Sequence, residues 1–426
     1  MMNRSISSNV KLITPIYLGT LLEWYDFSIF VFLAPILSNL FFPTSNTFVS
    51  TMMTYAVFAI GFVARPLGGM VFGQYADNHG RKKSMLSSMM IITISTTAIG
   101  LLPTYEKIGI CAPLAMVILR LVQGFCIGGE SSGAAVYVIE MFPSKYRGAL
   151  SSFMWSATGF GLLLGSSLTT WMFYLFSIDQ LNNGYWRLPF LMGMLTGLVG
   201  LYFRQKIPET NLYQLYRSRR EAMSARAHTV IKENKQTIFT IMLLYGLSSI
   251  ITYVLFVFMP VYISQHNGID LKTASLITTI ALSIASVLVP LSGYISDRLG
   301  RKFCLYAGSI GFLVLSIPLY SYMNTEKTVL SFILSDIIFV ILAILYQGAL
   351  TAAVQETTST NNRFTITSVG YNISYGLFGG TAPLLVSWMA EISGIQIMPG
   401  IYLAFFAFLA LAAVYRMKET YKMQLA

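Results

Sequence analysis

The sequence predicts an all-α membrane protein with twelve transmembrane helices in two pseudo-symmetric six-helix halves. Three observations support this: the composition, a series of long apolar runs, and a motif that occurs twice. Apolar residues make up 55% of the 426 residues and charged residues 11%, whereas a soluble domain carries about 25% charged residues. The mean hydropathy is +0.65. This composition indicates a chain whose surroundings are the lipid bilayer.

Apolar runs long enough to cross a bilayer follow one another along the chain. A spanning helix needs roughly 20 apolar residues. Backbone groups in lipid must be paired within their own segment, so each run is expected to be helical. Runs longer than this indicate tilted helices or ends that project past the lipid. In chain order, the expected helices cover residues 14–41, 47–76, 84–102, 111–141, 148–176, 186–204, 236–264, 273–296, 303–323, 328–355, 365–390 and 399–416.

One short motif occurs at two places that are 220 residues apart. Segments 73–82 and 293–302 share Gly, Asp, Gly, Arg and Lys at the same spacing, and each lies between two apolar runs. A repeat at about half the chain length indicates one structural unit used twice. We expect a first half over 1–204, a cytoplasmic linker over 205–235, and a second half over 236–426.

Basic residues are distributed unevenly between the predicted loops. If both termini are cytoplasmic, 22 of the 28 Lys and Arg lie in cytoplasmic segments and four lie on the other side. Basic loops stay in the cytoplasm, so this distribution predicts a multi-pass protein of the bacterial inner membrane with both termini inside. The net charge of +11 then reflects orientation, and we expect no nucleic-acid partner.

The cysteines and histidines form no pattern that indicates a metal site or a disulfide framework. The three cysteines, Cys111, Cys126 and Cys304, have no paired spacing. The sequence has no Walker A motif. We therefore expect no metal, no cofactor and no catalysed reaction, and a transport process that this chain does not drive with ATP.

Five short strings in the expected helices and loops are distinctive. They are Glu23-Trp24-Tyr25-Asp26-Phe27, Ala64-Arg65-Pro66-Leu67-Gly68-Gly69, the stretch Arg120–Glu130, Tyr185-Trp186-Arg187-Leu188-Pro189-Phe190 and Pro208-Glu209-Thr210. With them the chain resembles the major facilitator superfamily and, within it, the metabolite:proton symporter family, which includes proline/betaine, 2-oxoglutarate, citrate and shikimate importers. The resemblance implies the major facilitator fold and import of a small polar metabolite with protons by alternating access, by a protein that is usually a monomer.

The substrate class stays open between an organic acid and a zwitterion such as proline or betaine. The alternatives are a proton-driven exporter of a drug or siderophore, a siderophore importer, and a sensor that kept the fold without transport. Osmosensing members of the family carry a long C-terminal coiled coil. Only residues 417–426 follow the last expected helix here, so we do not expect osmotic regulation.

Acidic residues inside the expected helices are the candidates for proton coupling. A charge at the bilayer centre costs on the order of 3 kcal/mol, so such residues are functional candidates. Glu23 and Asp26 are three residues apart and share a helix face, and Glu130 lies in the fourth expected helix. Two neighbouring carboxylates favour the binding of a proton. The alternative is that Glu23 simply caps a helix or forms an ion pair.

Arg120 is the candidate clamp for a substrate carboxylate, because its guanidinium donates two parallel hydrogen bonds. Glu130 follows ten residues later and returns to about the same helix face, and Gln123 belongs to the same expected site. A repeat offset of 216 maps Arg120 onto Asp336, which we also assign to the site. The alternative is a structural ion pair of Arg120 with Asp336 or Asp26.

Aromatic residues near the expected helix centres form the second part of the predicted site. Aromatic faces bind quaternary ammonium groups, a property that suits betaine. Because aromatic residues make up 14% of the chain, plain packing or interfacial anchoring is the alternative. The candidates are Trp24, Tyr25, Tyr137, Trp155, Tyr371 and Tyr375.

Charged residues of the repeated segments are expected to form a cytoplasmic gate. Each motif Asp can face the positive N-terminus of a neighbouring helix and pair with the motif Arg. Glu–Arg pairs seven residues apart are expected to extend the network, with a purely topological role of the basic residues as the alternative. The predicted gate residues are Asp77, Arg81, Glu140, Arg147, Asp297, Arg301, Glu356 and Arg363.

Small residues and one further arginine complete the predictions. Gly124, Gly128 and Gly129 have the spacing that lets two helices approach closely. Arg65 lies in the second expected helix, and we expect it to form a structural ion pair.

Overall fold

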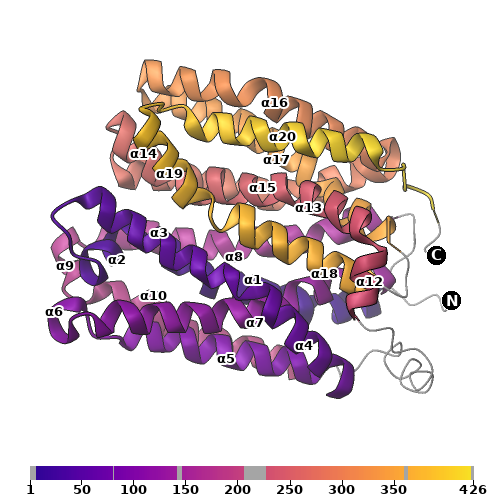
Figure 1. The fold of residues 1–426 in the computed structure, drawn as a ribbon, viewed down its shortest axis with the longest axis horizontal. Coiled ribbons are helices and arrows are strands. Elements are labelled where there is room, and N and C mark those ends of the chain that lie inside the picture. Colours follow the sequence, from indigo (N-terminus) through magenta and orange to yellow (C-terminus); the bar gives the residue numbers. More distant parts are fainter. Residues whose placement is uncertain (1–5, 80, 142–145, 206–226, 359–362, 424–426) are drawn as a thin grey trace.

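The computed structural model describes residues 6–79, 81–141, 146–205, 227–358 and 363–423, and these residues contain helices and no β-strand (Figure 1). Most of the predicted linker, residues 206–226, lies outside this range. The described part of the linker is the short helix α12 (Ala227–Glu233).

Long helices of the first half match the expected ranges closely. A bend of 59° separates α1 (Ile6–Phe32) from α2 (Ala34–Phe41), and Pro35 in the first turn of α2 lacks the N–H that would continue the helix. The sequence prediction joined these two helices and missed the bend. The other long helices are α3 (Thr47–Val63), α4 (Arg65–His79), α5 (Arg81–Leu101), α7 (Cys111–Met141), α8 (Arg147–Leu175) and α10 (Leu188–Gln205).

Helical segments of the second half include two wide, π-helical stretches that the apolar pattern does not reveal. They are η4 (Ile251–Phe258) and η5 (Tyr375–Gly379), which interrupt the seventh and eleventh expected helices. The remaining elements are α13 (Lys235–Ile250), α14 (Met259–Asn267), α15 (Leu271–Leu299), α16 (Arg301–Glu326), α17 (Val329–Glu356), α18 (Arg363–Ser374), α19 (Ala382–Ser393) and α20 (Met398–Arg416).

Three short elements connect long helices of the first half. They are α6 (Tyr105–Ile108), α9 (Ile178–Asn182) and η2 (Tyr185–Arg187). Ser177 begins α9 with a capping box, in which its hydroxyl accepts the N–H of Gln180 and the Gln180 side chain accepts the N–H of Ser177. Helices α6 and α9 lie at the same end of the bundle (Figure 1).

Nine helices within the described ranges are long and apolar enough to cross a membrane, or ten if α1 and α2 form one span. The predicted fold class agrees with this. Neither α8 nor the α18–η5–α19 segment is among them. The buried face of α8 is rich in Ser, Thr and Gly, because it packs against another helix rather than against lipid.

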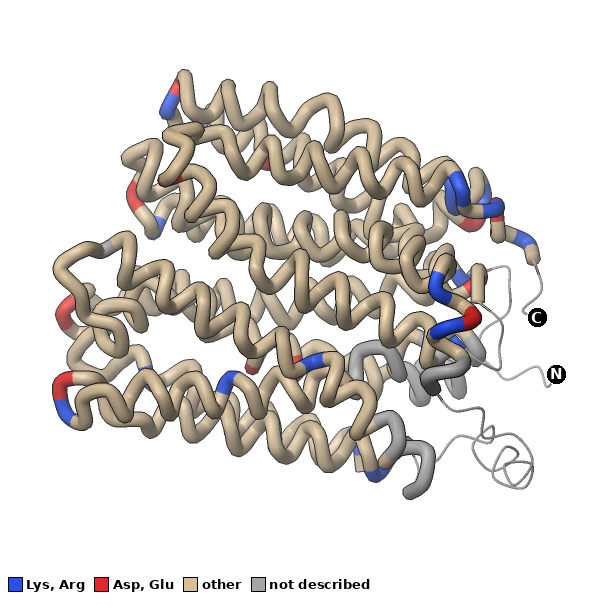
Figure 2. Tube along the Cα trace, viewed as in Figure 1, with Lys and Arg blue, Asp and Glu red and all other residues tan. Residues whose placement is uncertain are grey.

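The two halves lie side by side, with their long helices running between two ends of the bundle (Figure 1). We call the end where α12 lies and α20 finishes the terminal side, and the other end the opposite side. Charged residues gather at both ends and are sparse between them (Figure 2). This distribution is the one that a bilayer imposes, because charges are costly in the hydrocarbon core.

Helices α8 and α15 join the halves along much of their length. Near the terminal side, a Cβ on Gly148 would lie 2.5 Å from the carbonyl oxygen of Gly293. Further along, the Ser156 hydroxyl donates to the carbonyl oxygen of Ser286 at 2.7 Å. The closest approach therefore depends on glycine, and the glycine of the second motif is one of the pair.

The predicted close approach of helices through Gly124 and Gly128 is confirmed. A Cβ on Gly124 would lie 1.5 Å from the carbonyl oxygen of Gly61, and one on Gly128 would lie 1.9 Å from that of Arg65. Helix α7 therefore packs directly on the backbone of α3 and α4, which fixes the position of Arg65.

Candidate functional site

A cavity of about 50 Å³ lies between the two halves. Helices α1, α7 and α8 contribute its lining from the first half, and α13, α17, α18 and η5 contribute from the second. Small-molecule sites typically have volumes of about 300–1,000 Å³, so a solute fits here only when the lining side chains or the two halves move apart. The cavity has the position of a site that both halves share.

Five aromatic side chains line the cavity: Trp24, Trp155, Tyr245, Tyr371 and Tyr375. The centroids of Tyr371 and Tyr375 are 4.4 Å apart, and those of Tyr245 and Tyr371 are 5.1 Å apart. Trp24 meets Tyr375 edge to face at 6.1 Å. Sequence reasoning placed Trp24, Trp155 and both residues of the Tyr371–Tyr375 pair near the centre but missed Tyr245.

Tyr25 does not line the cavity, although it is adjacent to Trp24. Its hydroxyl donates to the carbonyl oxygen of Pro189 in α10 at 3.1 Å. Consecutive helical residues point about 100° apart, so one of the two faces the other half and its neighbour faces the interior of the first half. The side chain of Tyr137 lies outside the part of the chain that the structure describes.

Polar side chains of the second half complete the cavity wall. The Ser248 hydroxyl donates to Gln347 Oε1 at 2.7 Å, and Gln347 Nε2 donates to the carbonyl oxygen of Ser248 at 3.2 Å. Trp155 Nε1 is buried and donates no hydrogen bond. The wall thus offers aromatic faces with a few polar groups. Lone Ser and Gln residues in apolar helices carry little sequence signal, so these two were missed.

Arg65 lies directly behind the aromatic wall. Its guanidinium carbon is 5.9 Å from the ring centroid of Trp24, 5.5 Å from that of Tyr371 and 5.6 Å from that of Tyr375. The side chain is fully buried, and its Nε, Nη1 and Nη2 atoms donate no hydrogen bond. The expected structural ion pair is therefore wrong for the side chains that the structure describes. Contact with aromatic rings contributes about 2 kcal/mol, whereas burying a cation costs several kcal/mol.

Arg120 lies away from the cavity, inside the first half. Its Nη1 atom donates to Gln123 Oε1 at 2.9 Å, and Gln123 Nε2 donates to Thr96 Oγ1 at 2.8 Å. The rings of Phe27 and Phe30 lie 4.5 and 4.3 Å from the guanidinium carbon. Neither Arg120 nor Gln123 lines the cavity. The clamp hypothesis stays a prediction that requires movement of these residues.

The alternative for Arg120, an ion pair with Asp336 or Asp26, is not formed in this structure. Asp336 is buried in α17, outside the cavity lining, and neither of its carboxylate oxygens accepts a hydrogen bond. Its electrostatic neighbour is Tyr320 in α16. The repeat correctly relates the chain positions of Arg120 and Asp336. Both side chains nevertheless point into their own halves, so they do not meet.

The two acidic residues of α1 both face α10. Asp26 Oδ1 accepts a hydrogen bond from the Thr196 hydroxyl at 3.3 Å. Glu23 interacts electrostatically with Arg204 at the end of α10. Both carboxylates are buried and neither lines the cavity. The side chain of Glu130 is outside the described residues.

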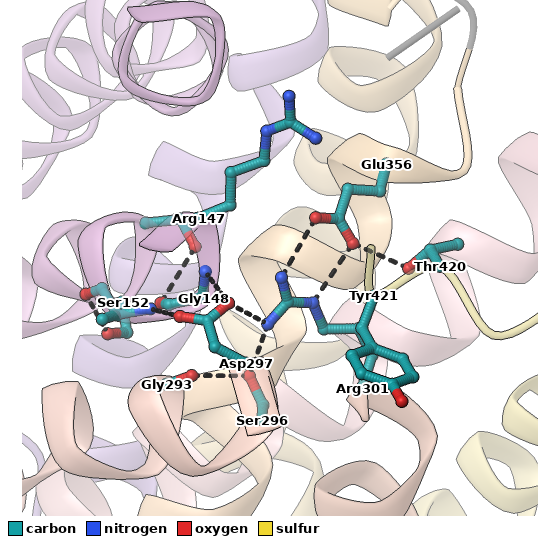
Figure 3. Close-up of polar contacts among 12 residues, drawn as sticks. Arg147, Gly148, Ser152, Gly293, Ser296, Asp297, Arg301, Glu356, Thr420 and Tyr421 are labelled. Atoms are coloured by element: carbon teal, nitrogen blue, oxygen red, sulfur yellow. Dashed lines mark hydrogen bonds and ion pairs between the residues drawn. The ribbon is translucent and has the colours of Figure 1, made fainter. Parts of the chain in front are cut away.

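On the terminal side, Asp297 of the second half binds the first turn of α8 in the first half (Figure 3). Its Oδ1 accepts the N–H of Gly148 at 2.8 Å, and its Oδ2 accepts the N–H of Ala149 at 2.9 Å. A carboxylate at a helix N-terminus is favoured by the helix dipole and by charge-assisted hydrogen bonds. The predicted contact of the motif aspartate with a helix N-terminus is confirmed for Asp297, and its role in gating stays a prediction.

Arg301 is the centre of the same network (Figure 3). Its Nη1 atom donates to Asp297 at 2.8 Å, and its Nε and Nη2 atoms bind both oxygens of Glu356 at 3.1 Å. The expected Glu356–Arg363 pair is wrong, because Arg363 donates to the carbonyl oxygens of Gln355 and Thr358 at 2.9 and 3.0 Å. We call Asp297, Arg301 and Glu356, with the first turn of α8, the terminal-side gate.

Residues after α20 bind the terminal-side gate, and the sequence analysis did not predict these contacts. Glu419 accepts the N–H groups of Arg301 and Lys302 at 2.9 and 3.0 Å, and the Thr420 hydroxyl donates to Glu356 at 2.8 Å. Arg147 donates to the carbonyl oxygen of Met423 at 3.1 Å. Three other predicted gate side chains, Asp77, Arg81 and Glu140, fall outside the described part of the chain.

Aromatic rings close the cavity toward the opposite side. Tyr253 of η4 contacts Phe58 and Phe62 of α3 with centroids 5.7 and 5.3 Å apart, and it contacts Tyr375 at 6.3 Å. These contacts also join the two halves. The cavity thus lies between a polar gate and an aromatic plug, defined by Phe58, Phe62 and Tyr253.

A family profile described as Major Facilitator Superfamily matches residues 16–383. The chain belongs to the Major Facilitator Superfamily. It is a multi-pass membrane transporter of the secondary type and not an enzyme, and the resemblance stated from the sequence strings is confirmed.

Two relatives that align with nearly the whole chain are both named as proline/betaine transporters. The proline/betaine transporter of Escherichia coli (strain K12) is 32% identical over 420 residues, which cover 96% of this chain and 83% of the relative. A relative from Staphylococcus haemolyticus (strain JCSC1435) with a provisional proline/betaine transporter name is 32% identical over 387 residues, covering 91% and 82%.

Solved structures with the same fold include the xylose transporter XylE. The partially occluded, inward-open form from E. coli has a TM-score of 0.78 at 19% identity and covers 98% of this chain and 100% of its own. The proton:xylose symporter XylE bound to 6-bromo-6-deoxy-D-glucose has a TM-score of 0.80 at 18% identity, covering 98% and 97%. At these identities the likeness establishes the fold alone.

Proposed function

We propose that this transporter imports a small zwitterion such as proline or betaine together with protons. The observation that carries the proposal is the aromatic wall of the central cavity, formed by Trp24, Trp155, Tyr245, Tyr371 and Tyr375. Aromatic faces attract substituted ammonium groups, and the polar pair of Ser248 and Gln347 can orient a small polar solute. The proline/betaine names of the relatives support the same substrate class.

Two sets of contacts between the halves support an alternating-access mechanism. The terminal-side gate and the aromatic plug lie on either side of the cavity, and both join the halves. Residues 1–204 and 236–426 would act as the two moving units. Opening to one side requires breaking one set of contacts while the other holds. Rocking of two repeat halves around a central site is the usual motion of such transporters.

The bacterial inner membrane is the proposed location, with both termini in the cytoplasm and a single chain as the working unit. The bias of basic residues toward the predicted cytoplasmic loops supports this orientation. The terminal side then faces the cytoplasm, and the aromatic plug faces the outside. Opening of the plug admits the substrate, and opening of the gate releases it.

Proton coupling is assigned to buried carboxylates of the first half. The buried Asp26 carboxylate accepts a hydrogen bond from the Thr196 hydroxyl, and it forms no ion pair with a described cation. A buried acid of this kind can take up a proton without first losing a partner, as in the proton relays of membrane transporters. Glu23 and Glu130 remain candidates for the same role.

Uptake by proteoliposomes tests this proposal. Labelled proline, glycine betaine, 2-oxoglutarate, citrate and shikimate would be supplied with and without an acidic exterior. We expect accumulation of proline and betaine that an uncoupler abolishes. Accumulation of the acids alone would refute the zwitterion assignment, and uptake without dependence on the proton gradient would refute the coupling. Accumulation driven by an acidic interior instead would identify a proton-driven exporter, because an antiporter moves its solute against the flow of protons.

A further inference from the structure

We infer that Arg65 binds the carboxylate of the transported solute and so restricts the substrate to zwitterions with an acidic group beside the cation. This inference rests on the proposed function and adds to it a residue and a chemical rule. It departs from the sequence prediction, which assigned the carboxylate to Arg120.

Arg65 is a fully buried cation that lies against the aromatic part of the cavity wall. Three of the four rings around its guanidinium, those of Trp24, Tyr371 and Tyr375, also line the cavity. The fourth ring, Phe62, belongs to the aromatic plug at 5.2 Å. Arg65 is thus positioned where the cavity meets the plug.

All three guanidinium nitrogens of Arg65 are buried without a hydrogen-bond acceptor. Buried arginines are stable when a carboxylate satisfies their fork of donors. No described carboxylate accepts hydrogen bonds from the Arg65 guanidinium. Asp26 accepts a hydrogen bond from Thr196 in α10, and Asp336 lies beside Tyr320 in α16. An acceptor that arrives through the cavity satisfies the requirement.

Backbone packing holds Arg65 in place. The carbonyl oxygen of Arg65 lies against Gly128, where a Cβ would be 1.9 Å away. The Asn372 side chain binds the carbonyl oxygen of Gly128 at 2.9 Å and ties α18 to the same point. The backbone of Arg65 is therefore fixed between both halves, and the rings of Trp24, Tyr371 and Tyr375 separate its guanidinium from the cavity, so contact with a solute requires these rings to move.

The fixed positive charge also orients the solute. A substituted ammonium group is repelled by Arg65 and is attracted by the aromatic faces farther along the wall, at Trp155 and Tyr245. A solute with a carboxylate next to its ammonium group satisfies both ends. A cation without a carboxylate meets only repulsion at Arg65, and a neutral sugar gains from neither feature.

Competition against labelled glycine betaine tests the inference. Unlabelled proline, choline and betaine methyl ester would compete in the wild type and in Arg65→Gln, Arg65→Lys and the control Arg187→Gln. Arg187 is also an arginine over a ring, at 4.5 Å from Trp186, but it lies outside the cavity. Wild type and the control are expected to prefer betaine over choline by about 100-fold, a ratio typical of losing one charge-assisted contact.

Arg65→Gln is expected to lower betaine affinity and to reduce that preference to within a few-fold, and Arg65→Lys to restore part of it. Thermal unfolding in detergent checks that the variants fold. Equal competition by choline and betaine in the wild type overturns the inference without any variant. Loss of the preference in Arg120→Gln instead of Arg65→Gln also overturns it, and places the carboxylate at Arg120. If the wild type takes up no zwitterion, the proposed function itself fails.

Discussion

Replacing Asp297 by Asn isolates the contact that holds the terminal-side gate closed. The carboxylate accepts two N–H groups of α8 at 2.8 and 2.9 Å and binds the buried guanidinium of Arg301 at 2.8 Å. Asparagine keeps one acceptor oxygen, but its NH2 group would face an N–H donor, and the negative charge of the carboxylate would be lost. The variant therefore loses the ion pair and one charge-assisted bond across the halves.

The expected loss is about 3 kcal/mol, since a hydrogen bond to a charged group contributes about 1.5–3 kcal/mol and breaking a buried ion pair costs about 3–5 kcal/mol. The lower figure applies because Arg301 keeps both oxygens of Glu356. A change of about 3 kcal/mol shifts the equilibrium between closed and open gate by roughly 100-fold.

Alkylation of a cysteine in the cavity measures this shift. Thr367 lines the cavity, so Thr367→Cys places a thiol there. The native Cys111, Cys126 and Cys304 would be changed to Ser. We expect a maleimide supplied from the terminal side to react up to roughly 100-fold faster in Asp297→Asn, in proportion to the open fraction. Asp270→Asn is the matched control, because Asp270 also accepts an N–H at a helix start but joins no halves. Equal rates in Asp297→Asn and the parent would refute this account of the gate.

The same alkylation assay checks three further predictions. Gly293→Ala places a Cβ 2.5 Å from the carbonyl oxygen of Gly148, so we expect α8 and α15 to separate at a cost of about 1–3 kcal/mol and the alkylation to accelerate. An unchanged rate would contradict the tight crossing of these helices. Glu419→Gln removes a negative charge from the start of α16, and a loss of about 1 kcal/mol predicts a roughly 5-fold faster alkylation. A slower alkylation would show that Glu419 does not stabilise the closed gate. Tyr253→Ala removes the centre of the aromatic plug, so reagent from the opposite side should gain access while reagent from the terminal side should not.

Hydropathy located the helices well but could not reveal their irregularities. The range 111–141 matches α7 (Cys111–Met141) because an apolar run and its polar ends are both visible in the sequence. The π-helical turn over Ile251–Phe258 lies inside an unbroken apolar run. The residues of this run are almost uniformly apolar, so the sequence carries no sign of the wider turn.

Side-chain roles were predictable where a repeated motif fixes local geometry. Asp297 and Arg301 are four residues apart in one such motif, so their pairing follows from helix geometry. Glu356 binds Arg301 and not the predicted Arg363. The packing of α16 against α17 determines this partner, and the spacing of residues along the chain does not reveal that packing. The predicted ion pair of Arg65 was wrong for a similar reason, since the rings around its guanidinium come from α1, α3, α18 and η5.

Equilibrium binding of labelled glycine betaine to the purified protein tests the central claim most directly, when wild type is compared with Tyr245→Leu. Tyr245 lies in the cavity wall and contacts Tyr371 and Tyr375, whereas the control Tyr202→Leu changes a tyrosine that is 56% exposed on α10. We predict saturable binding by wild type and Tyr202→Leu, and at least about a 10-fold weaker affinity for Tyr245→Leu, as expected for loss of a cation–π contact. Equal affinity in all three proteins would contradict the assignment of the central cavity as the substrate site.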